Sequence, residues 1–143
     1  MRNAISLRNK FEARNPKLET DSMTENGNLK HYELEDRTLV FARKVRFFVK
    51  KLPKTTANIE DGKQLIRASG SVGSNYIEAN ESLGKKDFLM RIKICRKEAK
   101  ESRYWLKLVD VDSKTDLEEE RKELEKEATE LTNIFGSIFR KSE

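Results

Sequence analysis

The sequence predicts an all-α fold, an antiparallel up-down-up-down four-helix bundle. Small and apolar residues recur at alternating steps of four and three in four successive segments, which is the spacing of helices that each bury one face. The chain of 143 residues contains only two prolines and six glycines, too few for the many turns of a β-sandwich. Short turns join the segments, so consecutive helices should lie antiparallel.

Residues 1–33 are expected to form a flexible N-terminal tail, because they contain few apolar and many polar side chains. The bundle then spans residues 34–143. A second methionine, Met23, lies in the tail. The intact mass of the natively expressed protein would show whether translation begins there.

The first two helices are separated by a proline. The first is expected over residues 35–52 and stops at Pro53, which cannot continue a helix. The second has Asn58 or Thr56 as its cap and continues to about residue 81. Their buried seams are Leu34, Thr38, Phe41, Val45, Phe48 and Leu52, and then Leu65, Ser69, Val72, Tyr76 and Ala79.

Two glycines lie inside the second predicted helix, where each costs about 1 kcal/mol relative to alanine. Gly70 and Gly73 form a strip with Ile66 and Ile77, at steps of four, three and four beside the seam. Such a strip lets another backbone approach closely, and we interpret it as a contact with a second copy of the chain. The alternative is that residues 68–74 form a loop, although the seam keeps its register through them.

Two further turns define the third and fourth helices. Residues 82–84 make the first turn, and either Ser82 or Gly84 caps a helix that ends near Val111. The last helix begins at Asp112, Ser113 or Thr115. The two seams are Phe88, Ile92, Cys95, Ala99, Ser102, Leu106 and Val109, and then Leu117, Leu124, Ala128, Leu131, Phe135 and Ile138 in a heptad-like pattern.

Composition indicates a cytoplasmic protein without a membrane span. No apolar run approaches the roughly 20 residues that a spanning helix needs, and the N-terminus has no apolar core of a signal peptide. The single cysteine, Cys95, lies on a predicted seam and has no partner for an internal disulfide. This cysteine usage agrees with a reducing compartment.

The formal net charge of +5 is unevenly spread along the chain. Residues 1–56 carry a net +6, residues 57–112 a net +2 and residues 113–143 a net −3. The basic N-terminal part permits contact with nucleic acid or another polyanion, but the modest overall balance does not require it.

Basic residues line one flank of the third predicted helix and an outward face of the first. They are Lys93, Arg96, Lys100, Arg103 and Lys107 on the third, and Arg43, Arg46, Lys50 and Lys54 on or just after the first. Either they bind phosphates, with an affinity that falls as salt rises, or they form an ordinary solvated face, with or without pairing to glutamates of the last helix. Few aromatic residues interleave them, so stacking on unpaired bases is not indicated.

The opposite flank of the third helix mixes apolar and acidic residues. Ile94, Trp105 and Leu108 would expose a large apolar surface in a monomer. With the glycine strip, this flank predicts an oligomer interface formed by Ile66, Gly70, Gly73, Ile77 and Trp105. The alternative is that the bundle covers the flank under its last helix.

The polar residues do not indicate an enzyme. Asn75, Glu78, Glu98 and Glu101 are candidates for a partly buried polar network, but bundle metal sites usually add histidines to such glutamates. The only histidine, His31, lies in the tail, so no Ser–His or Cys–His pair is expected in the bundle. A GxxxxGK[ST] phosphate loop is also missing. We expect no catalytic residue, no metal and no cofactor.

The stretch from residue 64 to residue 106 carries motifs of a known family. They are Gln-Leu-x-Arg-(Ala/Ser)-x-x-Ser at 64–71, Asn-Tyr-Ile-Glu-Ala at 75–79, Arg-Lys-Glu-Ala at 96–99, Glu-Ser at 101–102 and Tyr-Trp-Leu at 104–106. The chain resembles the small bacterial four-helix-bundle proteins encoded in intervening sequences of 23S ribosomal RNA genes, also labelled S23 ribosomal proteins. The resemblance extends from about Leu34 to Phe139, and Gly84 stands where the family often has a serine cap.

The resemblance implies a non-enzymatic bundle that assembles as a ring-like homopentamer. It also implies a relationship to the accessory protein of diversity-generating retroelements, whose basic pentamer binds nucleic acid and a reverse transcriptase. Five chains at +5 each would carry about +25, which concentrates a modest charge. We therefore expect a homo-oligomer that binds RNA or DNA, and the alternative is a structural adaptor that binds only a protein partner.

Overall fold

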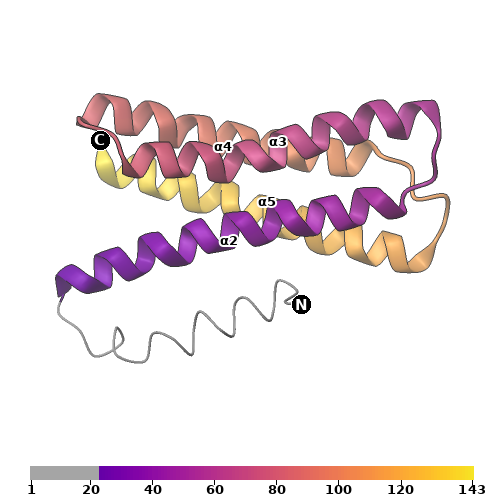
Figure 1. Cartoon of the computed structure of the whole chain (residues 1–143), viewed down its shortest axis with the longest axis horizontal. Coiled ribbons are helices and arrows are strands. Elements are labelled where there is room, and N and C mark those ends of the chain that lie inside the picture. Colours follow the sequence, from indigo (N-terminus) through magenta and orange to yellow (C-terminus); the bar gives the residue numbers. More distant parts are fainter. Residues whose placement is uncertain (1–22) are drawn as a thin grey trace.

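The computed structural model describes the backbone of residues 23–143 and the side chains from residue 33 onward. This part of the chain contains four helices and no strand: α2 (Met23–Lys51), α3 (Thr56–Asn80), α4 (Lys85–Leu108) and α5 (Thr115–Ser142). Each helix runs back along the one before it (Figure 1). The predicted all-α class is confirmed.

The first helix is longer at its N-terminus than predicted. It begins at Met23, well before the expected residue 35, and it ends at Lys51, just before Pro53. No proline interrupts the chain between these points, so nothing removes a backbone donor from the helix. Residues 23–33, which were assigned to the tail, are therefore helical. The rest of the predicted tail and the side chain of His31 lie outside the described residues.

The hydrophobic core consists of the four predicted seams. All the seam residues are buried except Leu34, Phe88 and Ile138, which are partly buried and pack against the others. At the centre the rings of Tyr76 and Phe135 meet edge to face, with centroids 5.5 Å apart. The alternating spacing of four and three residues in the sequence therefore identified the buried face of every helix.

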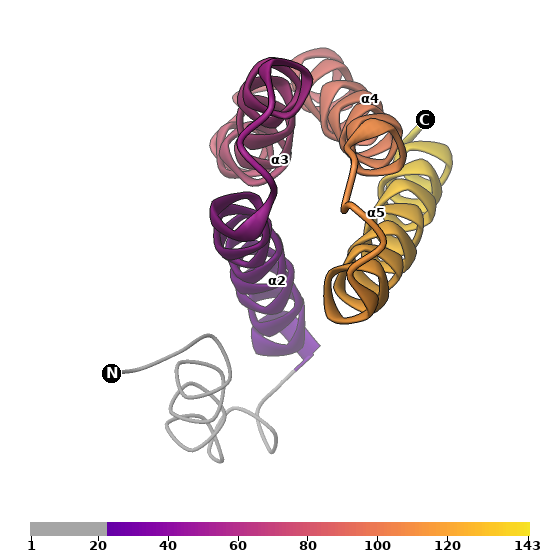
Figure 2. The ribbon, with the colours of Figure 1, turned by 90° about the vertical axis from the view of Figure 1, so that its right-hand side faces the viewer.

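The four helices form a ring in which each one touches two neighbours. The backbones lie close where α2 meets α3, α3 meets α4, α4 meets α5 and α5 meets α2. The diagonal pair α3 and α5 meets through core side chains, as Tyr76 and Phe135 do. Viewed end on, α2 and α3 lie on one side and α4 and α5 on the other (Figure 2). The border of α2 with α5 is the least extensive of the four.

Ion pairs hold this sparse border together. Nε and Nη2 of Arg37 on α2 each donate to the Glu127 carboxylate of α5 at 2.7 Å, and Nη2 also donates to Glu130 at 2.8 Å. Lys51 reaches Glu120 at 2.7 Å. The hydrogen bonds that Arg37 donates to Glu127 raise the pKa of Arg37 above its ordinary value, so the guanidinium stays charged.

A buried asparagine joins two turns at one end of the bundle. Thr55 caps α3 by accepting a hydrogen bond from the backbone N–H of Asn58 at 3.1 Å, so the cap is neither Thr56 nor Asn58 as predicted. The amide of Asn58 donates to the carbonyls of Pro53 at 3.1 Å and Asp110 at 2.8 Å. Its oxygen accepts from the Asp110 N–H at 2.9 Å. The polar side chain of Asn58 can be buried because it forms hydrogen bonds with backbone groups of both turns.

Helix α4 ends earlier than predicted, whereas α5 begins at one of the three predicted residues. Helix α4 is capped by Gly84 without a side-chain hydrogen bond, and it ends at Leu108 rather than near Val111. Asp112 and Ser113 then adopt positive φ values of 57° and 59°, a left-handed conformation that cannot continue a helix. Helix α5 begins at Thr115, one of the three predicted residues, with Lys114 as its N-cap.

The glycine strip is helical, so the loop alternative is wrong. Its glycines lie against α2 of the same chain. A Cβ on Gly73 would lie 2.7 Å from Oγ1 and 3.1 Å from Cβ of Thr38, and a Cβ on Gly70 would lie 3.2 Å from Nη2 of Arg46. The close approach that the glycines permit is therefore already made within one chain.

We expect Gly73→Ala to lower the free energy of unfolding by roughly 1–3 kcal/mol, because the methyl group forces apart two packed helices. This loss exceeds the gain in helix propensity, which is at most about 1 kcal/mol. Urea unfolding followed by circular dichroism measures the difference.

Gly70→Ala is the matched control, since its neighbour is the end of a flexible arginine and not a β-branched side chain. A second substitution, Thr38→Ala, should restore part of the stability lost by Gly73→Ala. Equal stability of the two alanine variants would contradict the close contact.

Candidate functional site

Five cations form a continuous row along α4, and we call this row the α4 ridge. Its members are Lys93, Arg96, Lys100, Arg103 and Lys107, and all five are exposed. The ridge lies on the side of α4 that borders α5. Lys93 Nζ is 5.8 Å from the centre of the Phe139 ring, and Arg96 lies over Gly136.

The α4 ridge is not neutralised by the acidic residues of α5. Among the side chains of residues 33–143, no ridge cation forms an ion pair. Glu120, Glu127 and Glu130 bind cations of α2 instead, and Glu118 pairs with Arg121 of its own helix. The alternative in which the last helix pairs with the ridge is therefore not what the structure shows.

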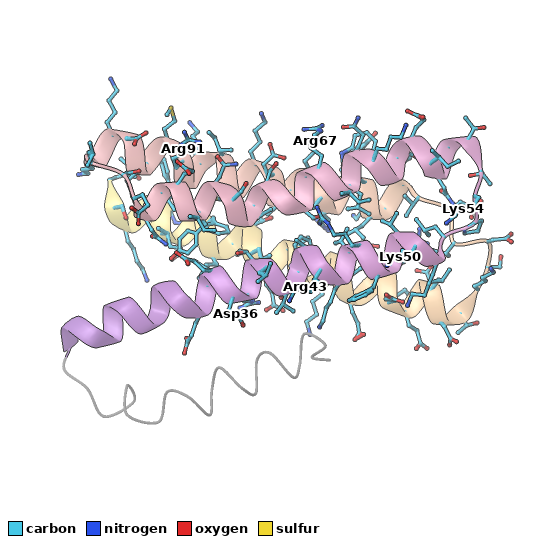
Figure 3. All side chains as sticks on the ribbon, viewed as in Figure 1. Asp36, Arg43, Lys50, Lys54, Arg67 and Arg91 are labelled. Atoms are coloured by element: carbon cyan, nitrogen blue, oxygen red, sulfur yellow. The ribbon has the colours of Figure 1, made fainter. Side chains whose placement is uncertain are left out.

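The predicted cations of α2 form a separate group. Arg46 lies against Gly70 of α3, and its Nη1 donates to the Ala42 carbonyl at 3.1 Å. Lys50 Nζ is 5.7 Å from the centre of the Phe47 ring. Figure 3 labels Arg43 and Lys50 on α2, away from α4. The structure thus does not bring the eight predicted cations onto one surface, because one group borders α3 and the other borders α5.

A groove of about 440 Å³ separates the outer edges of α2 and α3, and we call it the α2–α3 groove. It is lined by Glu35, Thr38, Leu39, Ala42, Arg43, Arg46, Gly70, Gly73, Ser74 and Ile77. Two apolar side chains on its rim, Leu39 and Ile77, are 49% and 50% exposed. The groove therefore contains three of the five predicted interface residues, and Ile66 is partly buried on the same flank of α3.

Trp105 lies on a different border from the groove. Arg67 of α3 approaches Glu101 to 3.9 Å, which places the Trp105 flank of α4 beside α3 and not under the last helix. Trp105 packs against the core and meets the Tyr104 ring edge to face, with centroids 5.0 Å apart. Its Nε1 is 3.5 Å from Glu101. The five predicted interface residues are therefore split between two borders.

The four predicted polar residues do not form one network. Asn75 accepts a hydrogen bond from Arg91 at 3.0 Å and donates to the Ser71 carbonyl at 2.8 Å. Glu78 is exposed. Oε1 of Glu98 is buried without a hydrogen-bond partner among the described residues. Desolvation raises the pKa of Glu98 above its ordinary value, and the nearby Glu101 adds to this rise.

We expect Glu98→Gln to stabilise the protein at pH 7. A carboxyl whose pKa is higher in the folded than in the unfolded state binds its proton more tightly when folded. Its charged form therefore lowers stability above the folded pKa, and this loss disappears as pH falls below the unfolded pKa. Melting temperatures at pH 7 and pH 4 measure the effect, which should be larger at pH 7.

Glu123→Gln controls for the change in net charge, since it removes an exposed carboxylate. If the advantage of Glu98→Gln has the same size at both pH values, desolvation of the carboxylate is not its cause.

Few of the described side chains could take part in catalysis. Cys95 is fully buried, and this burial raises its pKa to about 12, so the thiol is a core side chain and not a nucleophile. No group of three His, Cys, Asp or Glu residues among the described side chains could hold a metal ion. None of the described helices is long and apolar enough to cross a membrane.

Two functional features escaped the sequence analysis. Arg37 turns the α5 glutamates toward α2, and Arg140 lies beside Arg96 over Gly136. Gly136 lies inside the last helix but outside its seam, and a glycine at such a position was a detectable signal of a close contact. The identity of the side chains that cover it depends on how α4 and α5 pack.

Comparison with known proteins identifies a family and a similar solved structure. A family model described as 23S rRNA-intervening sequence protein matches residues 30–137. The chain is similar to a crystal structure of a protein with unknown function from the S23 ribosomal protein family of Bacteroides thetaiotaomicron VPI-5482. The TM-score is 0.64 and the identity 29%, over 73% of this chain and 96% of that chain. No curated protein matches the chain.

Proposed function

This chain belongs to the 23S rRNA-intervening sequence protein family, and we propose that it is a non-enzymatic, self-associating bundle that binds RNA or DNA through phosphate contacts. The observation that carries the proposal is the α4 ridge, whose five exposed cations have no acidic partner among the described residues. Unpaired cations in a row attract an extended polyanion, and release of its counterions favours binding.

The length of the ridge suits a short stretch of nucleic acid. Lys93 and Lys107 are separated by four turns of helix, or roughly 21 Å at 1.5 Å per residue. This length corresponds to about six base steps of a duplex at 3.4 Å each. Tyr104, 57% exposed, is the large exposed aromatic side chain of α4. One such ring gives little stacking, so phosphate contacts should dominate over base recognition.

Self-association is the second part of the proposal, and the α2–α3 groove is its surface. The occupant is a second copy of the chain, which offers matching charge on the opposite side of the bundle. Arg43 and Arg46 line the groove, and Glu119 and Glu123 are exposed on α5. None of these four forms an ion pair among the described side chains.

Contacts between opposite sides of identical chains are head-to-tail, and they form a ring when the rotation from one chain to the next closes. The family resemblance sets the expected number of chains in the ring at five, and we expect the ring to be cytoplasmic. Such a ring would place the α4 ridges of its chains around one particle. The combined charge would then strengthen the attraction of each ridge for a polyanion.

We expect the triple charge reversal Lys93→Glu, Arg96→Glu and Lys100→Glu to weaken binding of a 20-nucleotide RNA by at least about 100-fold. The slope of log affinity against log salt should fall by roughly two to three, since each lost phosphate contact removes about 0.7–0.9. Fluorescence polarisation at several salt concentrations measures both quantities.

The control is the triple variant Lys114→Glu, Lys122→Glu and Lys126→Glu, which changes the net charge equally at exposed positions outside the ridge. The two triple variants would bind alike if only the overall charge mattered, and that result would contradict the assignment of the ridge.

We expect Leu39→Glu to shift the molar mass in solution toward that of one chain, because it places a charge in the groove. Light scattering coupled to size exclusion at micromolar concentration measures the mass. Phe47→Glu is the matched control, since Phe47 is also 49% exposed on α2 but does not line the groove. A wild-type protein that is already monomeric would refute the proposed self-association.

The alternative function is a structural adaptor that contacts only a protein, such as a reverse transcriptase. The apolar rim of the groove favours it, since Leu39 and Ile77 are half exposed. The ratio of absorbance at 260 and 280 nm after purification separates the two functions. Copurified nucleic acid supports the proposed function, and a nucleic-acid-free protein that binds no RNA or DNA supports the adaptor.

A further inference from the structure

Two arginines from different helices converge over a single glycine of α5. A Cβ placed on Gly136 would lie 3.3 Å from Nη1 of Arg140 and 3.4 Å from Nε of Arg96. The two guanidinium groups are therefore close neighbours. Gly136 is buried although it lies outside the predicted seam, and the absence of a side chain is what lets both arginines lie against the backbone.

No ion pair compensates the charge of these two arginines among the described side chains. Residues 131–142 of α5 include no aspartate or glutamate, and Glu143, three residues after Arg140, forms no ion pair with either arginine. Lys93, whose amine lies over the Phe139 ring, adds a third positive charge nearby. Like charges held this close repel each other, and a bound anion would remove the repulsion.

The opposite end of the ridge differs. There α5 carries Glu118 and Glu125, although neither forms an ion pair with Lys107 or Arg103. The uncompensated positive charge is therefore concentrated at the end of the border where Arg96 meets Arg140.

We propose that Arg96 and Arg140 together bind one phosphate group on the border of α4 and α5, with Gly136 as the floor of the site. This inference rests on the proposed function and names the phosphate contact that anchors the nucleic acid. Guanidinium groups suit the task, because each presents several N–H donors in a planar fork and keeps its charge. The lysines of the ridge then act as point charges on neighbouring phosphates.

Inorganic phosphate tests the site without nucleic acid. The melting temperature of the full chain is measured in increasing phosphate and in chloride at equal ionic strength. A ligand that binds only the folded protein raises the melting temperature, so phosphate should stabilise the wild type beyond chloride. Arg140→Gln should lose this extra stabilisation. Lys141→Gln, with the same change of charge at the next residue, should keep it.

Gly136→Ala tests the geometry without changing the charge. The added methyl group displaces both guanidinium groups, whose flexible side chains can move away. Without phosphate the melting temperature should stay the same or rise, because alanine favours the helix. With phosphate the extra stabilisation should be lost. A loss of the phosphate effect without a loss of basal melting temperature excludes simple unfolding as the cause.

A fluorescent single-stranded RNA of 20 nucleotides tests the anchoring role. Arg140→Gln should weaken binding about five- to tenfold and lower the salt slope by about one, as loss of one phosphate contact does. Lys141→Gln should change the affinity less than about twofold, within the range of a solvent-exposed charge. Equal effects of Arg140→Gln and Lys141→Gln in both assays would overturn the proposal.

Failure of the site and failure of the proposed function give different results. If RNA binds but Arg140→Gln and Gly136→Ala behave like the control, the phosphate site is wrong and the function stands. If phosphate stabilises the wild type through Arg140 but no RNA or DNA binds, the anion site stands and the proposed function is wrong.

Discussion

The bundle depends on one buried seam per helix, because a chain with 38% charged residues has few apolar side chains to bury. Each seam uses a single face, which leaves two flanks of every helix outside the core. In a ring of four helices these flanks meet their neighbours along four borders. What each border contains then decides which surfaces are packed, which are neutralised and which remain available for a ligand.

The four borders have different chemistry. Small residues bring α3 close to α2, where Gly73 meets Thr38. Polar side chains join α3 to α4, where Asn75 accepts from Arg91. Ion pairs hold α2 to α5 through Arg37. Only the border of α4 with α5 combines a row of cations with a helix segment free of acidic residues.

This arrangement connects stability with the proposed binding of nucleic acid. Glutamates on α5 stabilise the sparse contact with α2, since Arg37 and Lys51 bind three of them. Because those carboxylates point to α2, they cannot neutralise the α4 ridge. The same asymmetry leaves Arg96 and Arg140 without an acidic partner among the described residues. A modest net charge thus becomes locally strong on one face.

The sequence by itself determined the helical class, the number of helices in the bundle and nearly every buried residue, because the alternation of four and three is a local property of each helix. It also indicated that Gly70 and Gly73 serve a close contact. Only the tertiary structure decided that this contact is with α2 of the same chain, that Trp105 borders α3 and that Thr55 caps α3. Only the structure brought Arg140 beside Arg96. These outcomes depend on which helices are neighbours and on their relative rotation, and the spacing of residues along one helix carries no information about either.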